Sequence, residues 1–269
     1  MKGTLHCHST WCDGHDTIEA MAAAAIERGH DFIGFSSHSM LPSSAEGWML
    51  TAEKAPLYAK AVRELAESLR GRISVYCGVE ADYIPGLSSP DRSSYASIQP
   101  DYVIGSVHYV LAPDGERVSV DSTPKSLLDG IAAHFDGSAQ KLIEAYFAQL
   151  RRMVAECDFD IVGHPDIFRK FNVRHPFFDE TAAWYVREME KTADALAAAG
   201  RPVEVNTGGI SRGWIDDAYP SEVFRSMLKG RGVRFVLSSD AHSADAIDCA
   251  FDRFSAYSQG FSLQSIGAI

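Results

Sequence analysis

Positive charge, paired cysteines and long apolar runs are all scarce in this chain of 269 residues. It carries 25 basic against 36 acidic side chains, which gives a formal net charge of −11. Nucleic acids and anionic membranes attract positive surfaces, so this charge argues against either as a constitutive partner. No uninterrupted apolar stretch approaches the ~18 residues that a membrane helix needs. We therefore expect no nucleic-acid partner and no membrane span.

Cysteine usage excludes two further classes. The five cysteines are scattered, odd in number and without a CxxC pair, which indicates neither a disulfide framework nor a cysteine zinc site. The amino terminus reads MKGTLHCHST, with polar residues where a signal peptide would carry its apolar core. We expect a cytoplasmic protein. The length and a hydrophobic content of 46% suit one domain over residues 1–269.

Strand-like and helical segments alternate along the chain. Seven short runs rich in apolar or β-branched residues predict strands at Thr4–His8, Asp31–His38, Ile73–Glu80, Tyr102–His108, Asp160–His164, Pro202–Asn206 and Arg234–His242. Helical patterns lie between most of them, at Thr17–Arg28, Ala52–Leu69, Ser138–Glu156, Asp179–Ala199 and Pro220–Lys229. Thr17 is the expected N-cap of the first helix, and Gly230 the stop of the last. This alternation predicts an α/β fold with parallel strands, either a doubly wound sheet or a closed barrel.

Two connections are long, about Asp82–Pro100 and Tyr109–Gly137, and we expect them to form active-site loops with short helices. Every predicted strand ends in a side chain that can bind a metal or a ligand: His8, His38, Glu80, His108, His164, Asn206 and Asp240 with His242. The carboxyl ends of barrel strands converge on one face, so these residues should meet in one pocket.

Two pairs strengthen the prediction of a metal site. His6 with His8, and Asp240 with His242, are spaced i and i+2, which places each pair on one face of a strand. Imidazole and carboxylate ligands together suit Zn²⁺, Mn²⁺ or Fe²⁺, and a carboxylate such as Glu80 can bridge two ions. Three histidines fall outside the pattern, and we interpret them as structural: His30, His134 and His175.

Several segments, in this order, resemble the polymerase and histidinol phosphatase (PHP) superfamily, and within it the histidinol-phosphate phosphatases. They are HCHSTWCDG (6–14), GFSSHS (34–39), GVEADY (78–83), YVIGSVHYV (102–110), VGHPDIFRKFN (162–172), EVNTGGISRG (204–213), YPS (219–221) and SSDAHS (238–243). The resemblance implies a distorted (β/α)7 TIM-like barrel whose strands carry a cluster of two to three divalent metal ions (Zn, Mn or Fe) at their carboxyl ends.

The resemblance also implies the ligands: His6, His8, His38, Glu80, His108, His164, Asp240 and His242. A ninth ligand comes from the loop after the first strand, where Asp13 and His15 compete and the Cys-Asp-Gly context favours Asp13. The implied activity is hydrolysis of a small phosphorylated metabolite, with L-histidinol phosphate of histidine biosynthesis as the expected substrate.

A phosphate dianion needs cations beyond the metals, and Arg169, Arg212 and Lys170 follow strand ends and are the candidates. The leaving alkoxide needs a proton, for which Asp240 and His242 are candidates unless they are committed as ligands. For the cationic end of the substrate, we consider acidic or aromatic residues of the long loops: Asp82, Tyr83, Tyr109 and Asp121.

Three alternatives stay open, as does the oligomeric state. A phosphatase of the same superfamily could cleave another small ester. An amidohydrolase would carry a metal-bridging lysine at the end of a middle strand, where this chain has Glu80 and His108. A nuclease is disfavoured by the net acidity.

Overall fold

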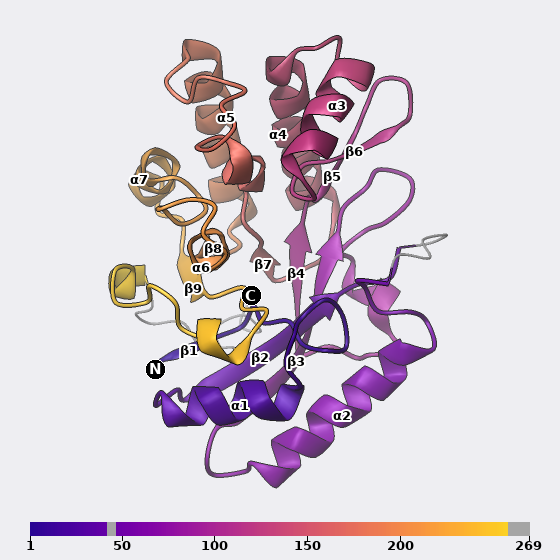
Figure 1. Ribbon diagram of the computed structural model, residues 1–269, viewed down its shortest axis with the longest axis vertical. Helices are drawn as coiled ribbons and strands as arrows, with labels where there is room; N and C mark the ends of the chain where they lie inside the picture. The colour runs from indigo at the N-terminus through magenta and orange to yellow at the C-terminus, as the bar shows by residue number, and fades with distance from the viewer. Residues whose placement is uncertain (42–46, 258–269) are drawn as a thin grey trace.

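The computed structural model describes residues 1–41 and 47–257. Seven parallel strands form one sheet in the order β1-β2-β3-β4-β7-β8-β9. Their bounds are β1 Gly3–Thr4, β2 Phe32–His38, β3 Ser74–Asp82, β4 Tyr102–Ser106, β7 Ile161–Val162, β8 Val203–Asn206 and β9 Phe235–Ser238. The chain beyond β1 meets the chain beyond β9, where His8 N donates to Ala241 O at 2.8 Å. This contact brings the two edge strands together, and the predicted seven-stranded, distorted barrel is confirmed (Figure 1).

Helices surround the sheet (Figure 1). Their bounds are α1 Ile18–Glu27, α2 Lys54–Ser68, α3 Pro124–His134, α4 Ala139–Glu156, α5 Ala183–Ala199, α6 Gly208–Ser211 and α7 Glu222–Gly230. Short 3-10 helices are η1 Arg92–Tyr95, η2 Ile167–Phe171, η3 Ala244–Ala246 and η4 Ser255–Tyr257. Within residues 1–41 and 47–257, no helix has the length and apolar character needed to cross a membrane.

The helix ends follow local capping chemistry. Thr17 caps α1 as predicted, because its side chain accepts a hydrogen bond from Ala20 N at 3.3 Å. The predicted limits of the last helix were wrong. The helix predicted at Pro220–Lys229 begins at Glu222, with Ser221 as its N-cap through Phe224 N, and Gly230 is its last residue instead of the stop.

Several strands are shorter than predicted. The expected strand Arg234–His242 ends at Ser238, because Asp240 adopts a left-handed conformation with φ of 48° that no strand accommodates. The Asp240 and His242 pair therefore lies on a turn beyond the strand. In the long connection after β4, the antiparallel hairpin of β5 Tyr109–Leu111 and β6 Arg117–Ser119 was not predicted.

A buried apolar cluster fills the barrel beneath the strand ends. Its members come from the β1 segment, β2, β4, β7 and β9: Leu5, Phe32, Tyr102, Ile104, Ile161 and Val236. Because side chains alternate along a strand, Phe32 faces the same side as His38. Gly78 leaves room for the largest member, since a Cβ there would lie 2.2 Å from Tyr102 Cζ. The polar residues at the strand ends thus lie above this apolar cluster, which we call the floor of the site.

Candidate metal centre

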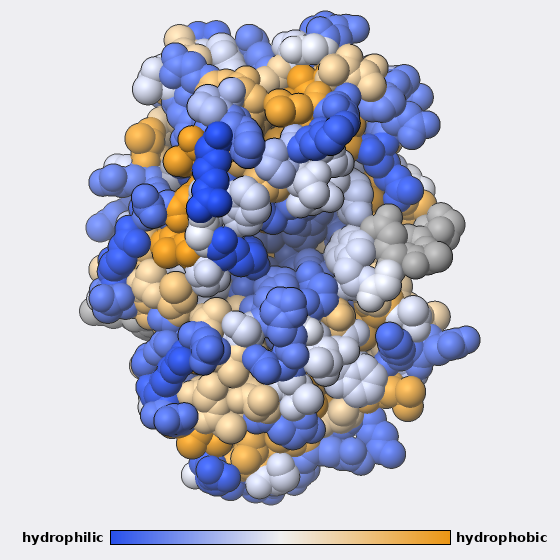
Figure 2. All heavy atoms as spheres, in the orientation of Figure 1, coloured by the Kyte–Doolittle hydropathy of each residue, from blue (hydrophilic) through white to orange (hydrophobic). Residues whose placement is uncertain are grey.

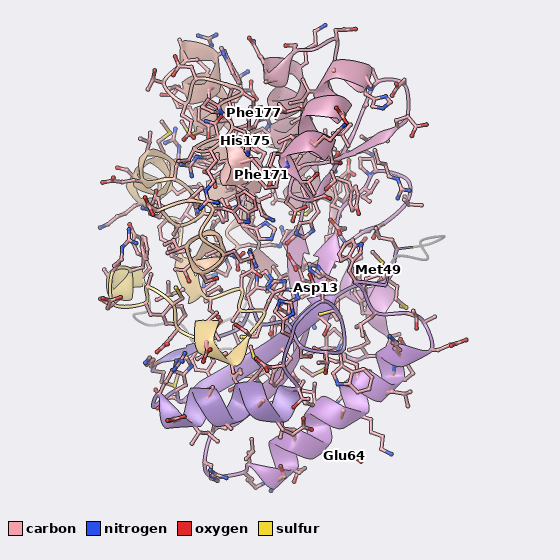
Figure 3. All side chains as sticks on the ribbon, viewed as in Figure 1. Asp13, Met49, Glu64, Phe171, His175 and Phe177 are labelled. Atoms are coloured by element: carbon pink, nitrogen blue, oxygen red, sulfur yellow. The ribbon has the colours of Figure 1, made fainter. Side chains whose placement is uncertain are left out.

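The structure brings nine of the ten predicted metal ligands together above this floor. Within each of four groups, the ligand atoms lie within 4.8 Å of one another: His8, Asp13, His38 and His242; His6, Glu80 and His164; His6, His8 and Asp240; and His38, Glu80 and His108. The groups share members and so form one cluster. Asp13 lies near the middle of the molecule in the view of Figure 3.

Glu80 lies at the centre of the cluster. Its Oε2 is 3.2 Å from His6 Nε2 and 3.0 Å from His38 Nδ1. Its Oε1 is 2.8 Å from His164 Nε2 and 3.3 Å from His108 Nε2. Each oxygen therefore faces its own set of imidazoles, which is the arrangement that a carboxylate bridging two ions requires.

The buried polar atoms of the cluster show that the residues fit divalent metal ions. Several of them have no hydrogen-bond partner within the described part of the chain: His6 Nε2, His8 Nε2, Asp13 Oδ1, His38 Nδ1 and Glu80 Oε2. An unsatisfied buried polar atom costs free energy, so a set of them aimed at one another needs a further partner. Imidazole nitrogens and carboxylate oxygens are the ligands that divalent ions such as Zn²⁺ accept.

The electrostatics keep the carboxylates of Glu80 and Asp240 and the imidazole of His8 in the forms that bind metal. Burial alone would raise the pKa of Glu80, but its histidine neighbours, His6 foremost, outweigh burial and hold this pKa well below its usual range. Burial is likewise overcome at Asp240, where Arg212 has the largest lowering effect on the carboxyl pKa. Burial lowers the pKa of His8 to about 3. The carboxyls are thus ionised and the imidazole of His8 is neutral.

Two carboxylates behind the cluster were not predicted as its supports. Glu204 is fully buried on β8, and its Oε2 lies 2.9 Å from His6 Nδ1. Asp82, considered from the sequence as a substrate contact, instead places Oδ1 at 3.0 Å from His108 Nδ1. Such outer carboxylates fix the tautomer and orientation of ligating histidines. A glutamate within the apolar run PVEVN was the available signal for Glu204.

A cavity of ≈ 400 Å³ opens onto the cluster. Figure 2 shows it as a recessed hydrophilic area in the middle of the molecule. Arg212 and Lys170 line it, together with Asp121. Arg212 is held in place by Asp240 Oδ2 at 3.0 Å from Nη2, and by His242 Nδ1 at 2.9 Å from Nη1.

Arg169, predicted to bind phosphate, is not among the residues that line the cavity. Its Nε donates to Glu180 Oε2 at 2.7 Å, and its Nη1 lies 3.5 Å from Asp166 Oδ2. Arg169 is buried, so these carboxylates compensate its charge within the protein. The physical reason is the 3-10 turn of η2, which directs Lys170 to the cavity and Arg169 away from it.

The remaining predicted residues are dispersed. His15 lines the cavity but is exposed and belongs to none of the four ligand groups found in the described residues, which favours Asp13 as the ninth ligand. Tyr83 bonds to Glu156 at 3.0 Å, away from the cluster. His175 lies beside Phe171 and Phe177, apart from Asp13 (Figure 3). His30 and His134 are also outside the four groups of the described residues.

Comparison with known proteins agrees with this geometry. The model of the PHP domain matches residues 4–208. A protein of Deinococcus radiodurans named probable histidinol-phosphatase is 28% identical over 249 residues, which cover 91% of this chain and 88% of that one. The structure of HisK from Listeria monocytogenes is similar with a TM-score of 0.80, at 20% identity over 93% of this chain and 99% of that one. Histidinol phosphate phosphatase from Lactococcus lactis, complexed with zinc, L-histidinol and phosphate, is similar with a TM-score of 0.68, at 18% identity over 97% of this chain and 94% of that one.

Proposed function

Since the chain belongs to the PHP domain family, we propose that it is a metal-dependent phosphomonoester hydrolase, a histidinol-phosphatase that converts L-histidinol phosphate and water into L-histidinol and phosphate. The carrying observation is the cluster of six histidines and three carboxylates beneath a cavity that Arg212 and Lys170 line. The names of the relatives and the ligands of the Lactococcus lactis structure support the choice of substrate. A sheet whose strands run from residue 3 to residue 238 supports one functional unit over residues 1–269.

The nine clustered residues would hold two to three divalent ions, and Glu80 would be a ligand through both of its oxygens, each of which faces its own imidazoles. When bound, such ions supply a Lewis acid for the phosphate and a water of lowered pKa. Nine clustered ligand residues exceed the four that one Zn²⁺ ion usually takes, which supports more than one ion. Zn, Mn or Fe suits this mixture of imidazole and carboxylate ligands.

The chain's own cations bind and orient the phosphate in this proposal. Arg212 presents its guanidinium to the cavity while Asp240 holds it from behind. The Nε of Arg212 is buried with no hydrogen-bond partner in the described residues. Lys170 adds a second positive charge to the same cavity. Fixed cations around a phosphoryl group stabilise the charge of its transition state.

The test is phosphate release by protein loaded with Zn²⁺, Mn²⁺ or Fe²⁺. We expect kcat/KM for L-histidinol phosphate to exceed that for glycerol phosphate and 4-nitrophenyl phosphate. Glu80→Gln should lose bound metal and more activity than the ~10–100-fold cost of losing an outer-shell partner. His134→Gln is the matched control, because His134 pairs with Asp114 outside the cluster.

Several results would contradict the proposal. Absence of phosphate release at millimolar L-histidinol phosphate would refute a histidinol-phosphatase, and equal kcat/KM on all three esters would indicate a general phosphatase. Degradation of single-stranded DNA without phosphomonoesterase activity would favour a nuclease. Ammonia release from a cyclic amide or amine would favour an amidohydrolase.

A further inference from the structure

Two neighbouring hollows share the contact between Lys170 and Asp121 as part of their lining. The first is the cavity over the metal ligands. The second, which we call the outer hollow, lies beside the β5–β6 hairpin and is lined on its own side by Trp48, Tyr109, Ser119 and Ser126. Lys170 and Asp121 line both hollows, as do the proposed metal ligands Asp13, His38 and His108. A ligand that reaches from the metal ligands toward the hairpin therefore passes beside Lys170 and Asp121.

The contact between the two side chains is a loose one. Lys170 Nζ donates its hydrogen bond, at 2.7 Å, to the backbone oxygen of Asp121, while the nearest carboxylate oxygen, Oδ2, is 3.8 Å away. In the described part of the chain, the carboxylate accepts only a long hydrogen bond, 3.4 Å from Ser119 Oγ. The side chain of Lys170 is 11% exposed and that of Asp121 is 26% exposed. The Asp121 carboxylate therefore retains unused acceptor capacity facing the hollows.

We propose that substrate binding separates Lys170 from Asp121, so that Lys170 takes the phosphate and Asp121 takes an ammonium group on the carbon next to the esterified carbon. This inference rests on the proposed function and names the feature that its substrate must carry. In L-histidinol phosphate, the ammonium-bearing carbon is bonded directly to the carbon that carries the ester oxygen. The substrate thus offers a negative phosphate to Lys170 and, beside it, a positive ammonium to Asp121.

The exchange accounts for selectivity through an unpaired charge. When Lys170 moves toward a phosphate, Asp121 loses the ammonium that lies 3.8 Å from its carboxylate, and a partly buried carboxylate with less positive charge beside it is costly. A substrate ammonium restores the pairing. An ester that lacks this group leaves the Asp121 carboxylate less compensated and binds with a penalty. Asp121 therefore discriminates against amine-free esters as well as attracting the amine.

The decisive experiment compares two substrates, L-histidinol phosphate and its deamino analogue, 3-(imidazol-4-yl)propyl phosphate. The readout is the ratio of their kcat/KM values. Asp121→Asn should lower kcat/KM for L-histidinol phosphate and raise it for the analogue, which reduces the ratio by about tenfold to a hundredfold, as expected for a hydrogen bond between charged groups. Asp121→Ser, which also removes the charge, should give the same crossover. Lys170→Met should lower both values, because both substrates carry the phosphate.

Asp114→Asn is the matched control, since Asp114 lies in the turn of the same hairpin and is absent from the lining of both hollows. It should leave the ratio unchanged. A ratio that stays within twofold of the wild type in both Asp121 variants would overturn the exchange, as would an equal loss on the two substrates. Failure of the proposed function would look different, because the wild-type protein would then release phosphate from neither ester.

Discussion

Replacing Glu204 by glutamine is the sharpest test of how the metal centre is held. The two oxygens of Glu204 have different tasks. Oε1 accepts hydrogen bonds from His164 N at 2.7 Å and Asn206 Nδ2 at 2.8 Å, and Oε2 faces His6 Nδ1 at 2.9 Å. Since His6 Nε2 faces the cluster, its Nδ1 carries the proton and donates to Glu204.

Glutamine can satisfy only one side of this arrangement. If its carbonyl keeps the two bonds of Oε1, its NH₂ group is directed at His6 Nδ1. Two donors then face each other, and the imidazole must move its proton to Nε2 or rotate, and either change removes a metal ligand. Loss of an outer-shell partner costs ~10–100-fold in metal affinity, which corresponds to about 1.4–2.8 kcal/mol. We expect Glu204→Gln to weaken metal binding within this range.

The assay is competition for Zn²⁺ against a chromophoric chelator, with elemental analysis of the purified variant. Glu188→Gln is the control, because Glu188 is also a buried carboxylate but pairs with Arg151 and Lys191 on the outside of the barrel. That variant should lose stability toward urea and keep its affinity for metal. If Glu204→Gln binds Zn²⁺ within twofold of the wild type while remaining folded, the reasoning from the hydrogen bonds is refuted.

Three further outcomes are expected. Gly208→Ala places a Cβ 2.7 Å from Asp240 Oδ2, and the resulting displacement of Asp240 should lower kcat/KM about a hundredfold. Gly230→Ala is the control, because nothing lies within 4 Å of the new Cβ, and it should leave kcat/KM unchanged. Equal activity of the two variants would contradict the argument. Phe168→Ala removes a fully buried ring and should lower the free energy of unfolding, measured by urea denaturation, by ~3–5 kcal/mol. A loss below about 1 kcal/mol would show that neighbouring side chains fill the space left by the ring. Burial lowers the pKa of His30 below its unfolded value of about 6.5, so the unfolded chain binds the proton more readily and His30 destabilises the fold as pH falls through that value. Between pH 7.5 and 5.5, the urea midpoint of His30→Gln should therefore fall less than that of the wild type. Parallel pH curves of the two midpoints would argue against this role.

The gathering of the proposed ligands in one place could be predicted because their signal is local. A histidine or carboxylate directly after a short apolar run is visible in one sequence, and parallel topology then brings such residues together. The exact strand limits could not be predicted in the same way. Asp240 has φ of 48°, which ends the strand early, and neither its side chain nor its neighbours announce this conformation. Asp240 and His242 still belong to the cluster, because the turn that carries them lies at the end of the strand and faces it.

Contacts that depend on side-chain direction were harder to predict. Arg169 and Lys170 are adjacent in the sequence and chemically similar, yet only Lys170 lines the cavity. Glu204 and Asp82 became recognisable as supports only when His6 and His108 were placed beside them. Residues that hold a ligand from behind belong to neighbouring strands, and no spacing rule along one chain connects them.

The backbone hydrogen bond between His8 and Ala241, which closes the barrel, has a consequence for biosynthesis. It joins residues near the two ends of the chain, and the ligands Asp240 and His242 lie just beside it. During translation, His6, His8 and Glu80 are made long before Asp240 and His242. A growing polypeptide therefore cannot assemble the full set of proposed ligands until the segment beyond β9 has been made.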